Sequence, residues 1–261
     1  MVTLIENPTP ELLLELQQFC SASCLGVKAI GPLLSYGTSY SFVSAWEQKN
    51  EAGERTAFLS KDYGTVVAYL ASNASEDDLE ELKAFLSVIG YSVLISSPEV
   101  TETEPAGFLM KLEQGKDCIA QGTKEPVTFV ADEHLEEFYG LLAQNNPGYF
   151  AEDFDAWLVD FSHRIRHGTA SSLLLQVGTD FCSSAAALSI TEPAVFLGAI
   201  STNINCRGKH YAYSVLSHLA QQYSHKTVYL MCKPEKQAFY EKAGMHTVGT
   251  YAERKGEMYH A

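Results

Sequence analysis

The sequence predicts an α/β protein built on a mixed sheet, in which parallel and antiparallel strands occur together. Three observations predict this fold class. The composition is globular, with 46% hydrophobic and 19% charged residues. Strand and helix patterns are present along the whole chain, and those of the second half follow the order β-α-α-β-β-β-α-β-α-β. Because this order does not simply alternate strand and helix, it predicts an antiparallel meander that leads into a β-α-β unit.

Length and charge set the broad class of protein. The 261 residues correspond to between one and two domains, and they can bury a core without a disulfide or a structural metal. The formal net charge of −14 argues against general binding to nucleic acid or to an anionic membrane. No apolar stretch approaches the length of a membrane span, and the first residues lack the pattern of a signal peptide, so we expect a cytoplasmic protein.

The cysteines do not form a metal-binding pattern. The six are scattered, and no C-x-x-C motif occurs; they are Cys20, Cys24, Cys118, Cys182, Cys206 and Cys232. Cys20 and Cys24 have no second Cys/His pair nearby to complete a zinc site. We therefore expect no metal, and thiols that stay reduced in the cytoplasm.

Elements of the first half are predicted from residue 9 onward. An apolar helix at 9–20 precedes a loop rich in Gly and Ser, and three strands follow, near residues 40–46, 56–61 and 64–70. Ser75 and the three acids behind it are typical of a helix N-cap and first turn, and this helix continues to about residue 89. The half then ends with a strand at 91–96, a polar stretch at 97–106 and a strand at 108–112.

A polar run at 115–126 contains two glycines and a proline, which favours a boundary between two units. We therefore predict one domain at 1–122 and a second at 123–261. The first carries a net charge of −10 and the second −4, whereas residues 193–252 carry +4. A basic segment in an acidic protein favours a local anionic ligand, although solvated surface lysines are the alternative.

Elements of the second half are more regular. The predicted order is a strand at 127–131, helices at 132–144 and 153–167, strands at 170–178, 181–191 and 194–202, a helix at 208–224, a strand at 226–232, a short helix at 235–243 and a strand at 245–252. Stop signals agree with these ends: Asn145-Asn146-Pro147-Gly148 follow the first helix, and Gly168 and Gly244 follow two others.

The turn between the 194–202 strand and the 208–224 helix carries the strongest chemical signal. It reads Arg207-Gly208-Lys209-His210-Tyr211-Ala212. The start of a helix exposes unpaired backbone N–H groups at the positive end of the helix dipole, and Gly208 allows phosphate oxygens to approach the backbone closely. The segment matches neither the G-x-G-x-x-G nor the G-x-x-x-x-G-K motif, so neither a Rossmann nor a P-loop site is supported.

A second segment lies one strand further on and reads Phe239-Tyr240-Glu241-Lys242-Ala243-Gly244-Met245. The two segments in this order resemble the GNAT superfamily of CoA-dependent N-acetyltransferases, in which R/Q-x-x-G-x-G/A opens a helix and F-Y-E-K-x-G-F follows. The resemblance covers residues 127–252. By pattern alone, the first half resembles the divergent GNAT-like half of two-part members. The implied fold is therefore the GNAT fold in the second half and a smaller GNAT-like first half.

The resemblance implies a site for acetyl-CoA as co-substrate. The backbone of the Arg207–Ala212 turn would hold the pyrophosphate: Arg207, Gly208, Lys209, His210, Tyr211 and Ala212. The preceding strand, at Ile200, Ser201 and Thr202, would pair with the pantetheine arm, and Phe239 and Lys242 would flank the co-substrate. Tyr240 would sit near the sulfur atom and protonate the leaving thiolate.

The implied reaction is direct attack of a primary amine on the thioester, without a covalent enzyme intermediate. A backbone N–H would stabilise the oxyanion, an effect typically worth ~3–4 kcal/mol. The acceptor is an amine of a small molecule or a peptide, and the acidic first half favours a cationic one. We expect no nucleic acid or membrane partner; a homodimer is one expected assembly, with the first half as part of the acceptor cleft or a dimer contact.

Two positions depart from the family pattern. His210 replaces the usual Gly, and its imidazole either crowds the pyrophosphate or donates to it. Met245 replaces Phe, a tolerable apolar exchange. The exchange at His210 motivates an alternative hypothesis, in which the protein binds or senses acyl-CoA without catalysis.

A base must also accept the proton of the amine, because alkyl amines are protonated at pH 7. Candidates are Glu152, Asp153, His163 and His167, and two neighbouring arginines, Arg164 and Arg166, could bind an acidic group instead. A solvated helix face is the alternative for all of them.

Overall fold

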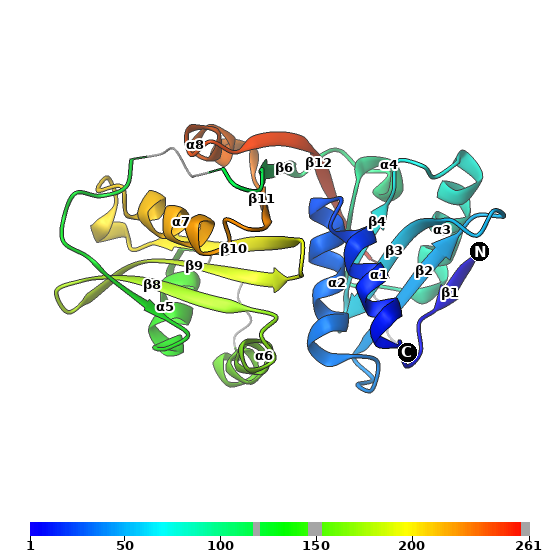
Figure 1. Ribbon diagram of the computed structural model, residues 1–261, viewed down its shortest axis with the longest axis horizontal. Helices are drawn as coiled ribbons and strands as arrows, with labels where there is room; N and C mark the ends of the chain where they lie inside the picture. The colour runs from blue at the N-terminus through cyan, green and yellow to red at the C-terminus, as the bar shows by residue number, and fades with distance from the viewer. Residues whose placement is uncertain (117–120, 146–152, 257–261) are drawn as a thin grey trace.

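Twelve strands form a single mixed sheet in the computed structural model, which describes residues 1–116, 121–145 and 153–256. The order in the sheet is β1-β2-β3-β4-β5-β12-β6-β11-β10-β9-β8-β7 (Figure 1). Read from the two edges, the order is symmetric: the first five strands of one half mirror the first five of the other, and β12 and β6 meet in the middle.

The two halves have the same order of strands and α-helices. The first half contains β1 (Val2–Leu4), α1 (Pro10–Cys20), α2 (Cys24–Tyr36), β2 (Val43–Lys49), β3 (Arg55–Asp62), β4 (Thr65–Leu70), α3 (Glu76–Ile89), β5 (Val93–Ser96), α4 (Pro98–Thr101) and β6 (Gly107–Leu112). The second half contains β7 (Thr128–Ala131), α5 (Leu135–Asn145), α6 (Phe154–Arg166), β8 (Ser171–Val177), β9 (Asp180–Ile190), β10 (Ala194–Thr202), α7 (Tyr211–Gln222), β11 (Thr227–Cys232), α8 (Gln237–Lys242) and β12 (His246–Lys255).

The last strand of each half is exchanged into the other half. β6 pairs with β11, β12 pairs with β5, and the two exchanged strands also pair with each other, all antiparallel. In Figure 1, β12 runs along the top from the second half to the first. The predicted strand at 108–112 therefore exists, but its ladder partners come from the second half of the chain.

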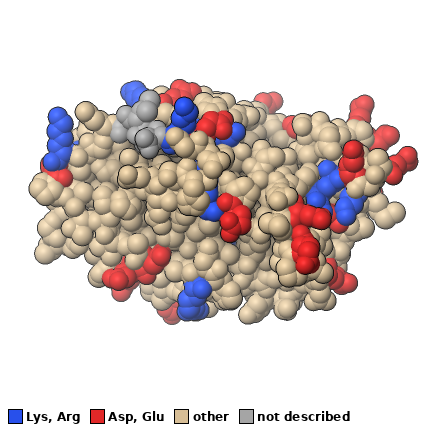
Figure 2. Space-filling model, viewed as in Figure 1, with Lys and Arg blue, Asp and Glu red and all other residues tan. Residues whose placement is uncertain are grey.

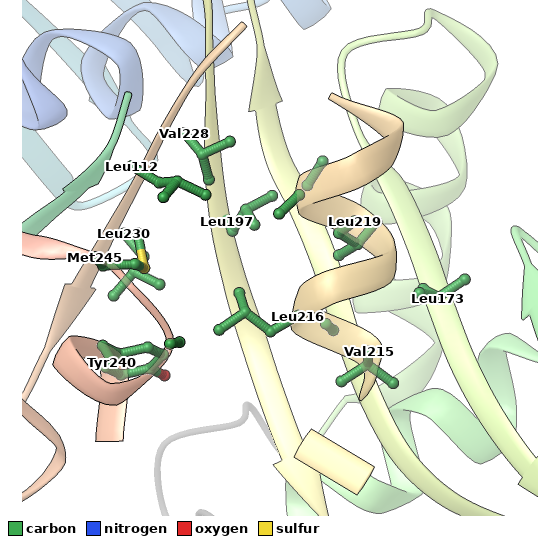
Figure 3. Close-up of a cluster of buried hydrophobic side chains, with 14 of the residues drawn as sticks. Leu112, Leu173, Leu197, Val215, Leu216, Leu219, Val228, Leu230, Tyr240 and Met245 are labelled. Carbon is green, nitrogen blue, oxygen red and sulfur yellow. The ribbon is translucent and has the colours of Figure 1, made fainter. Parts of the chain in front are cut away.

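The predicted meander and β-α-β unit are confirmed. Strands β7, β8, β9 and β10 pair antiparallel in sequence order, and β10 then pairs parallel with β11 across the α7 connection. Apolar residues of α7 pack on this face of the sheet, where Val215, Leu216 and Leu219 meet Leu173, Leu197 and Leu230 (Figure 3). Since these residues recur at helical spacing on one element and alternate on the others, the pattern located the core correctly.

The loop predicted after the first helix is wrong, because residues 24–36 form α2. Its glycines and Pro32 look like loop signals, but the helix is buried along most of its length between the two halves (Figure 1). Glycine is needed there for close approach: a Cβ on Gly26 would lie 2.2 Å from the Cys20 carbonyl oxygen, and one on Gly31 would lie 3.0 Å from the Ser189 hydroxyl. Tertiary packing therefore overrides local propensity.

Two short elements also escaped prediction. β1 pairs with β2 at the edge of the sheet, and α4 makes one helical turn inside the polar 97–106 stretch. The other helices agree within a few residues, and Ser75 caps α3 as expected. The stop signal at Asn146-Pro147-Gly148 and the thiol of Cys118 lie outside the described residues.

On the face shown in Figure 2, many of the acidic side chains lie on the right, over the first half. This agrees with the uneven charge of the two halves. Among the helices of the described ranges, none combines the length and the apolar character that crossing a membrane requires.

Candidate functional site

The site begins where the parallel strands β10 and β11 stop pairing. Their ladder joins Ala194–Leu197 to Thr227–Leu230 and ends there. Further along, β10 contains a bulge, in which two residues, Ala199 and Ile200, stand opposite one residue of β9. Ala199 adopts a left-handed conformation with φ 53°. A bulge re-aims the backbone groups of a strand, so β10 turns N–H and C=O groups away from its ladder at this point.

The Arg207–Ala212 turn lies at the end of the diverging strand. Gly208 and His210 both have positive φ, 82° and 64°. His210 is the N-cap of α7, and its side chain makes no capping hydrogen bond. The His210 side chain therefore does not compete with a ligand for the N–H groups at the positive end of the helix dipole.

His210 holds a left-handed conformation without being a glycine. A residue with positive φ is most easily a glycine, and histidine is among the few other types that tolerate this region. The His210 side chain is exposed and stacks on Tyr213, with ring centroids 5.9 Å apart, and Tyr213 stacks on Phe239 at 4.3 Å. The imidazole thus extends a row of rings along one wall of the site.

One cavity of about 610 Å³ joins these features. Ten of the twelve predicted site residues line it: Ile200, Ser201, Thr202, Arg207, Gly208, His210, Tyr211, Ala212, Phe239 and Tyr240. Lys209 and Lys242 do not line it. Eight further residues do, and sequence reasoning missed them: Asn145, Cys206, Tyr213, Met231, Cys232, Lys233, Glu235 and Lys236.

Signals for some of the missed residues were present in the sequence. Met231 and Cys232 end the second of two parallel strands and Lys233 follows it, and ligands bind beyond the carboxyl ends of such strands. Asn145, at the end of α5, had no local signal. Its side-chain oxygen accepts a hydrogen bond from the Arg207 guanidinium, and its amide donates to the Ser201 hydroxyl at 2.8 Å. These two hydrogen bonds connect the end of α5 to β10 and to the Arg207–Ala212 turn.

Contacts behind the turn hold it in place. The buried Tyr211 hydroxyl donates to the Glu125 carboxylate, which raises the pKa of the phenol well above its usual value. The ammonium of Lys209 lies 3.9 Å from the same carboxylate. The Lys209 side chain therefore points toward Glu125 and does not line the cavity.

Tyr240 projects from α8 into the buried wall of the cavity. Its ring packs in the same apolar cluster as Leu230 and Met245 (Figure 3) and is 9% exposed. Burial raises the pKa of the phenol far above its ordinary value, with a smaller effect from the nearby Cys232 thiol. The hydroxyl is therefore protonated at neutral pH and can act as a proton donor.

The cavity also has a cationic rim. Arg207, Lys233 and Lys236 line it, together with one carboxylate, Glu235. Lys233 lies 3.5 Å from Glu253 and is half exposed, so this ion pair is weak. The excess of cations agrees with the anionic ligand that the basic 193–252 segment predicted.

The candidate bases on α6 are placed elsewhere, and none of those described lines the cavity. Asp153 caps α6 by accepting a hydrogen bond from the Ala156 amide at 3.1 Å. His163 stacks on Tyr36 at 4.4 Å and contacts the Ser35 carbonyl, and Arg164 pairs with Asp62 of the first half at 2.7 Å. His163 and Arg164 therefore join the two halves.

His167 and Arg166 do not line the cavity either. His167 ends α6 and stacks on His163, and Arg166 is exposed. Glu152 lies outside the described residues.

The fold of the chain is similar to several solved structures. The chain is similar to an acetyltransferase of the GNAT family from Colwellia psychrerythraea, with a TM-score of 0.55, 15% identity, and 98% of this chain and 100% of the other covered. It is similar to a GCN5-related N-acetyltransferase from Sphaerobacter thermophilus, with a TM-score of 0.56, 12% identity, and coverage of 98% and 95%.

A third similar structure is a tandem GNAT protein from the clavulanic acid biosynthesis pathway, with a TM-score of 0.55, 9% identity, and 98% of each chain covered. The match extends over both halves of the chain. No family model and no curated protein matches the sequence. At these identities the likeness establishes the fold.

Proposed function

The chain has the GNAT fold in two GNAT-like parts, and from this premise we propose that its second half transfers the acetyl group of acetyl-CoA to a primary amine. One observation carries the proposal: a helix N-terminus in a basic turn, the ends of two parallel strands that have stopped pairing, and a buried tyrosine all line one cavity. These are the parts that a thioester with a diphosphate tail requires.

The turn fits the diphosphate group of acetyl-CoA. Phosphate oxygens would accept hydrogen bonds from the backbone N–H groups of the Arg207–Ala212 turn, at the end of the helix where the dipole favours negative charge. A Cβ on Gly208 would meet no atom within 4 Å, so the turn is open on its outer side. Arg207, Lys233 and Lys236 add positive charge near the same cavity.

The diverging strands fit the pantetheine arm. Beyond Leu197, β10 has lost β11 as its partner, and Ile200 of the bulge lines the cavity. An extended amide-containing chain can pair with the backbone of such a strand as an additional strand does. A backbone N–H of the bulge would then stabilise the oxyanion of the tetrahedral intermediate, an effect typically worth ~3–4 kcal/mol.

Tyr240 would complete the transfer. When the amine attacks the thioester carbonyl, the carbon–sulfur bond breaks and the thiolate requires a proton. The Tyr240 phenol lines the cavity and carries its proton at neutral pH, so it would donate that proton. Cys232, which also lines the cavity, has a pKa raised by burial to about 11, so its thiol stays protonated and is no nucleophile in this scheme.

Steady-state kinetics with acetyl-CoA and a panel of small cationic and neutral amines tests the proposal. Tyr240→Phe should lower kcat about 100-fold, while the Kd for acetyl-CoA stays within about threefold of wild type. Tyr223→Phe is the matched control, since Tyr223 is a buried tyrosine of the same core outside the cavity. Its kcat should not change.

Each other outcome has a definite meaning. Full activity of Tyr240→Phe removes Tyr240 as the acid. Binding of acetyl-CoA without turnover of any amine supports the alternative, a non-catalytic acyl-CoA-binding module. A protein that does not bind acetyl-CoA at all contradicts both functions.

A further inference from the structure

Two thiols meet directly before the Arg207–Ala212 turn. Cys182 lies on β9 and Cys206 ends the short 3-10 turn Ile204–Cys206, and their sulfur atoms are 2.6 Å apart. Both are free thiols. A disulfide bond requires sulfur atoms about 2.05 Å apart, so only a small movement separates this pair from a covalent bond.

Backbone contacts beside the two thiols hold β9 and the end of β10 together. The Asn203 N–H donates to the Cys182 carbonyl at 2.9 Å, and the Ser183 hydroxyl donates to the Ser201 carbonyl at 2.7 Å. β9 and β10 also pair between Ser183 and Thr202. Residues 201–203, which lead into the turn, are therefore held against β9 close to the pair.

The two thiols differ in their access to solvent. Cys206 is partly exposed and borders two cavities: the one described above and a second of about 500 Å³ between α5 and the β8–β9 connection. Cys182 is 3% exposed, and burial raises the pKa of its thiol to about 12. A small oxidant dissolved in water therefore reaches Cys206 first.

A metal does not explain the pair. Among the described residues, no third His, Cys, Asp or Glu joins it in a group that could hold a metal ion. The other described thiols do not explain it either, because Cys20, Cys24 and Cys232 are buried at other places in the two cores.

We propose that Cys182 and Cys206 are a redox modification site, at which a hydroperoxide converts the two thiols into a disulfide that clamps the Arg207–Ala212 turn to β9. The Cys206 sulfur attacks one oxygen of hydrogen peroxide, the O–O bond breaks, and Cys206 becomes a sulfenic acid with release of one water. The Cys182 sulfur then displaces the hydroxyl group from Cys206, and its proton leaves with that group as a second water. Two thiols are oxidised by two electrons and one peroxide is reduced; a dithiol reverses the reaction.

The bond would close a loop of about 25 residues, which constrains the unfolded chain. Oxidation should therefore raise Tm by about 5 °C. The effect on the binding of acetyl-CoA rests on the proposed function: a clamped turn is preorganised, so affinity should rise about threefold.

Peptide mapping of the full-length protein provides the test. The protein is treated with a small excess of hydrogen peroxide, blocked with an alkylating reagent without reductant, digested and measured by mass spectrometry. The expected product is a linked peptide pair containing residues 182 and 206, which dithiothreitol separates. Linkage to other cysteines, or conversion of Cys206 to sulfinic acid without linkage, would overturn the proposal.

Variants extend the test to thermal stability. Cys206→Ser should abolish the linked peptide and the rise in Tm on oxidation, whereas wild type shows both. Cys182→Ala serves as a second variant, and peptide mapping of wild type decides the question even if either variant folds poorly. Mapping does not use acetyl-CoA, so a disulfide in a protein that fails to bind acetyl-CoA would contradict the proposed function alone. An unchanged affinity after oxidation would contradict only the action on the turn.

Discussion

Helices α3 and α7 occupy the same place in the two halves but begin with opposite chemistry. Each connects two parallel strands, β4 with β5 and β10 with β11. α3 begins with a full capping box, in which Ser75 and Asp78 satisfy each other's backbone N–H groups, and with three acids in the first turn. α7 begins after a basic turn, and its N-cap residue, His210, is left-handed and makes no side-chain capping hydrogen bond.

The difference separates what a fold requires from what a site requires. Both helices pack an apolar face on the sheet; Leu82 belongs to this face in α3 and Leu219 in α7. At α3, the Ser75 hydroxyl accepts the Asp78 N–H and three acids repel phosphate, whereas at α7 the N-cap side chain accepts no N–H and the turn before the helix is basic. If acetyl-CoA binds this chain, the second half should therefore be the half that binds it.

The largest effect is expected when α7 is given the acidic start of α3. Ala212→Asp places a carboxylate in the first turn, on a residue that lines the cavity. The Kd for acetyl-CoA should rise at least ~100-fold, about 2.7 kcal/mol, because like charges meet at the diphosphate position. The fold should not suffer, since a carboxylate at a helix N-terminus stabilises the helix.

Isothermal titration calorimetry and a thermal melt measure both effects in one preparation. Gln221→Glu adds the same charge at the exposed, opposite end of α7 and should leave the Kd unchanged. Normal binding by Ala212→Asp would show that the diphosphate does not lie at the start of α7.

A smaller effect is expected at the start of α3. The Ser75 N–H donates to the Asp78 carboxylate at 2.9 Å, which lowers the pKa of that carboxyl group. A lowered folded-state pKa contributes stability above the unfolded value of about 3.9, and this contribution is lost as pH falls through the lower folded-state value. Asp78→Asn should therefore cost about 1 kcal/mol at pH 7 and close to nothing at strongly acid pH, where wild type is protonated as well.

Urea unfolding at several pH values measures this contribution. Asp77→Asn is the control, because Asp77 is exposed in the same turn and lies outside the capping box. Binding of acetyl-CoA should be the same in both variants. A loss of binding in Asp78→Asn would mean that the two halves are coupled or that the first half holds the ligand.

The sequence predicted most of the second half because its signals are local. Apolar spacing located α7, the meander followed from alternating strands, and the basic turn marked the start of the helix. α2 was missed because its stability comes from burial between the halves, which no local pattern contains. The exchange of β6 and β12 was missed for the same reason, since a strand's pattern does not name its partner.

The site residues were also predictable where their signals were local. Residues of the turn, of the strand before it and of α8 could be named because each stands in a recognisable segment. Asn145 and Cys206 enter the cavity through contacts between distant segments, with Arg207 and with Cys182 respectively. The candidate bases that the structure describes lie away from this cavity, and sequence could not place them, because polar residues on a helix face look alike whether they line a cleft or, as with Arg164 and Asp62, an interface.

The smallest effect is expected at His210, where two physical changes oppose each other. His210→Gly relieves a left-handed residue of its Cβ, which stabilises the turn, but it also removes a ring stacked on Tyr213. The free energy of unfolding should therefore change by no more than about 0.5 kcal/mol. Since the proposed diphosphate contacts come from backbone N–H groups, which glycine retains, the Kd for acetyl-CoA should stay within about threefold.

Calorimetry on His210→Gly also decides between the two roles that sequence reasoning left open for the imidazole. A Kd that rises about tenfold or more would mean that the ring donates to the ligand. A Kd that falls by as much would mean that the ring crowds the ligand in wild type, and turnover that appears only in the variant would make this residue the cause of a lost activity. Unchanged binding would leave His210 as the residue that holds the left-handed bend, which is the property that distinguishes the start of α7 from that of α3.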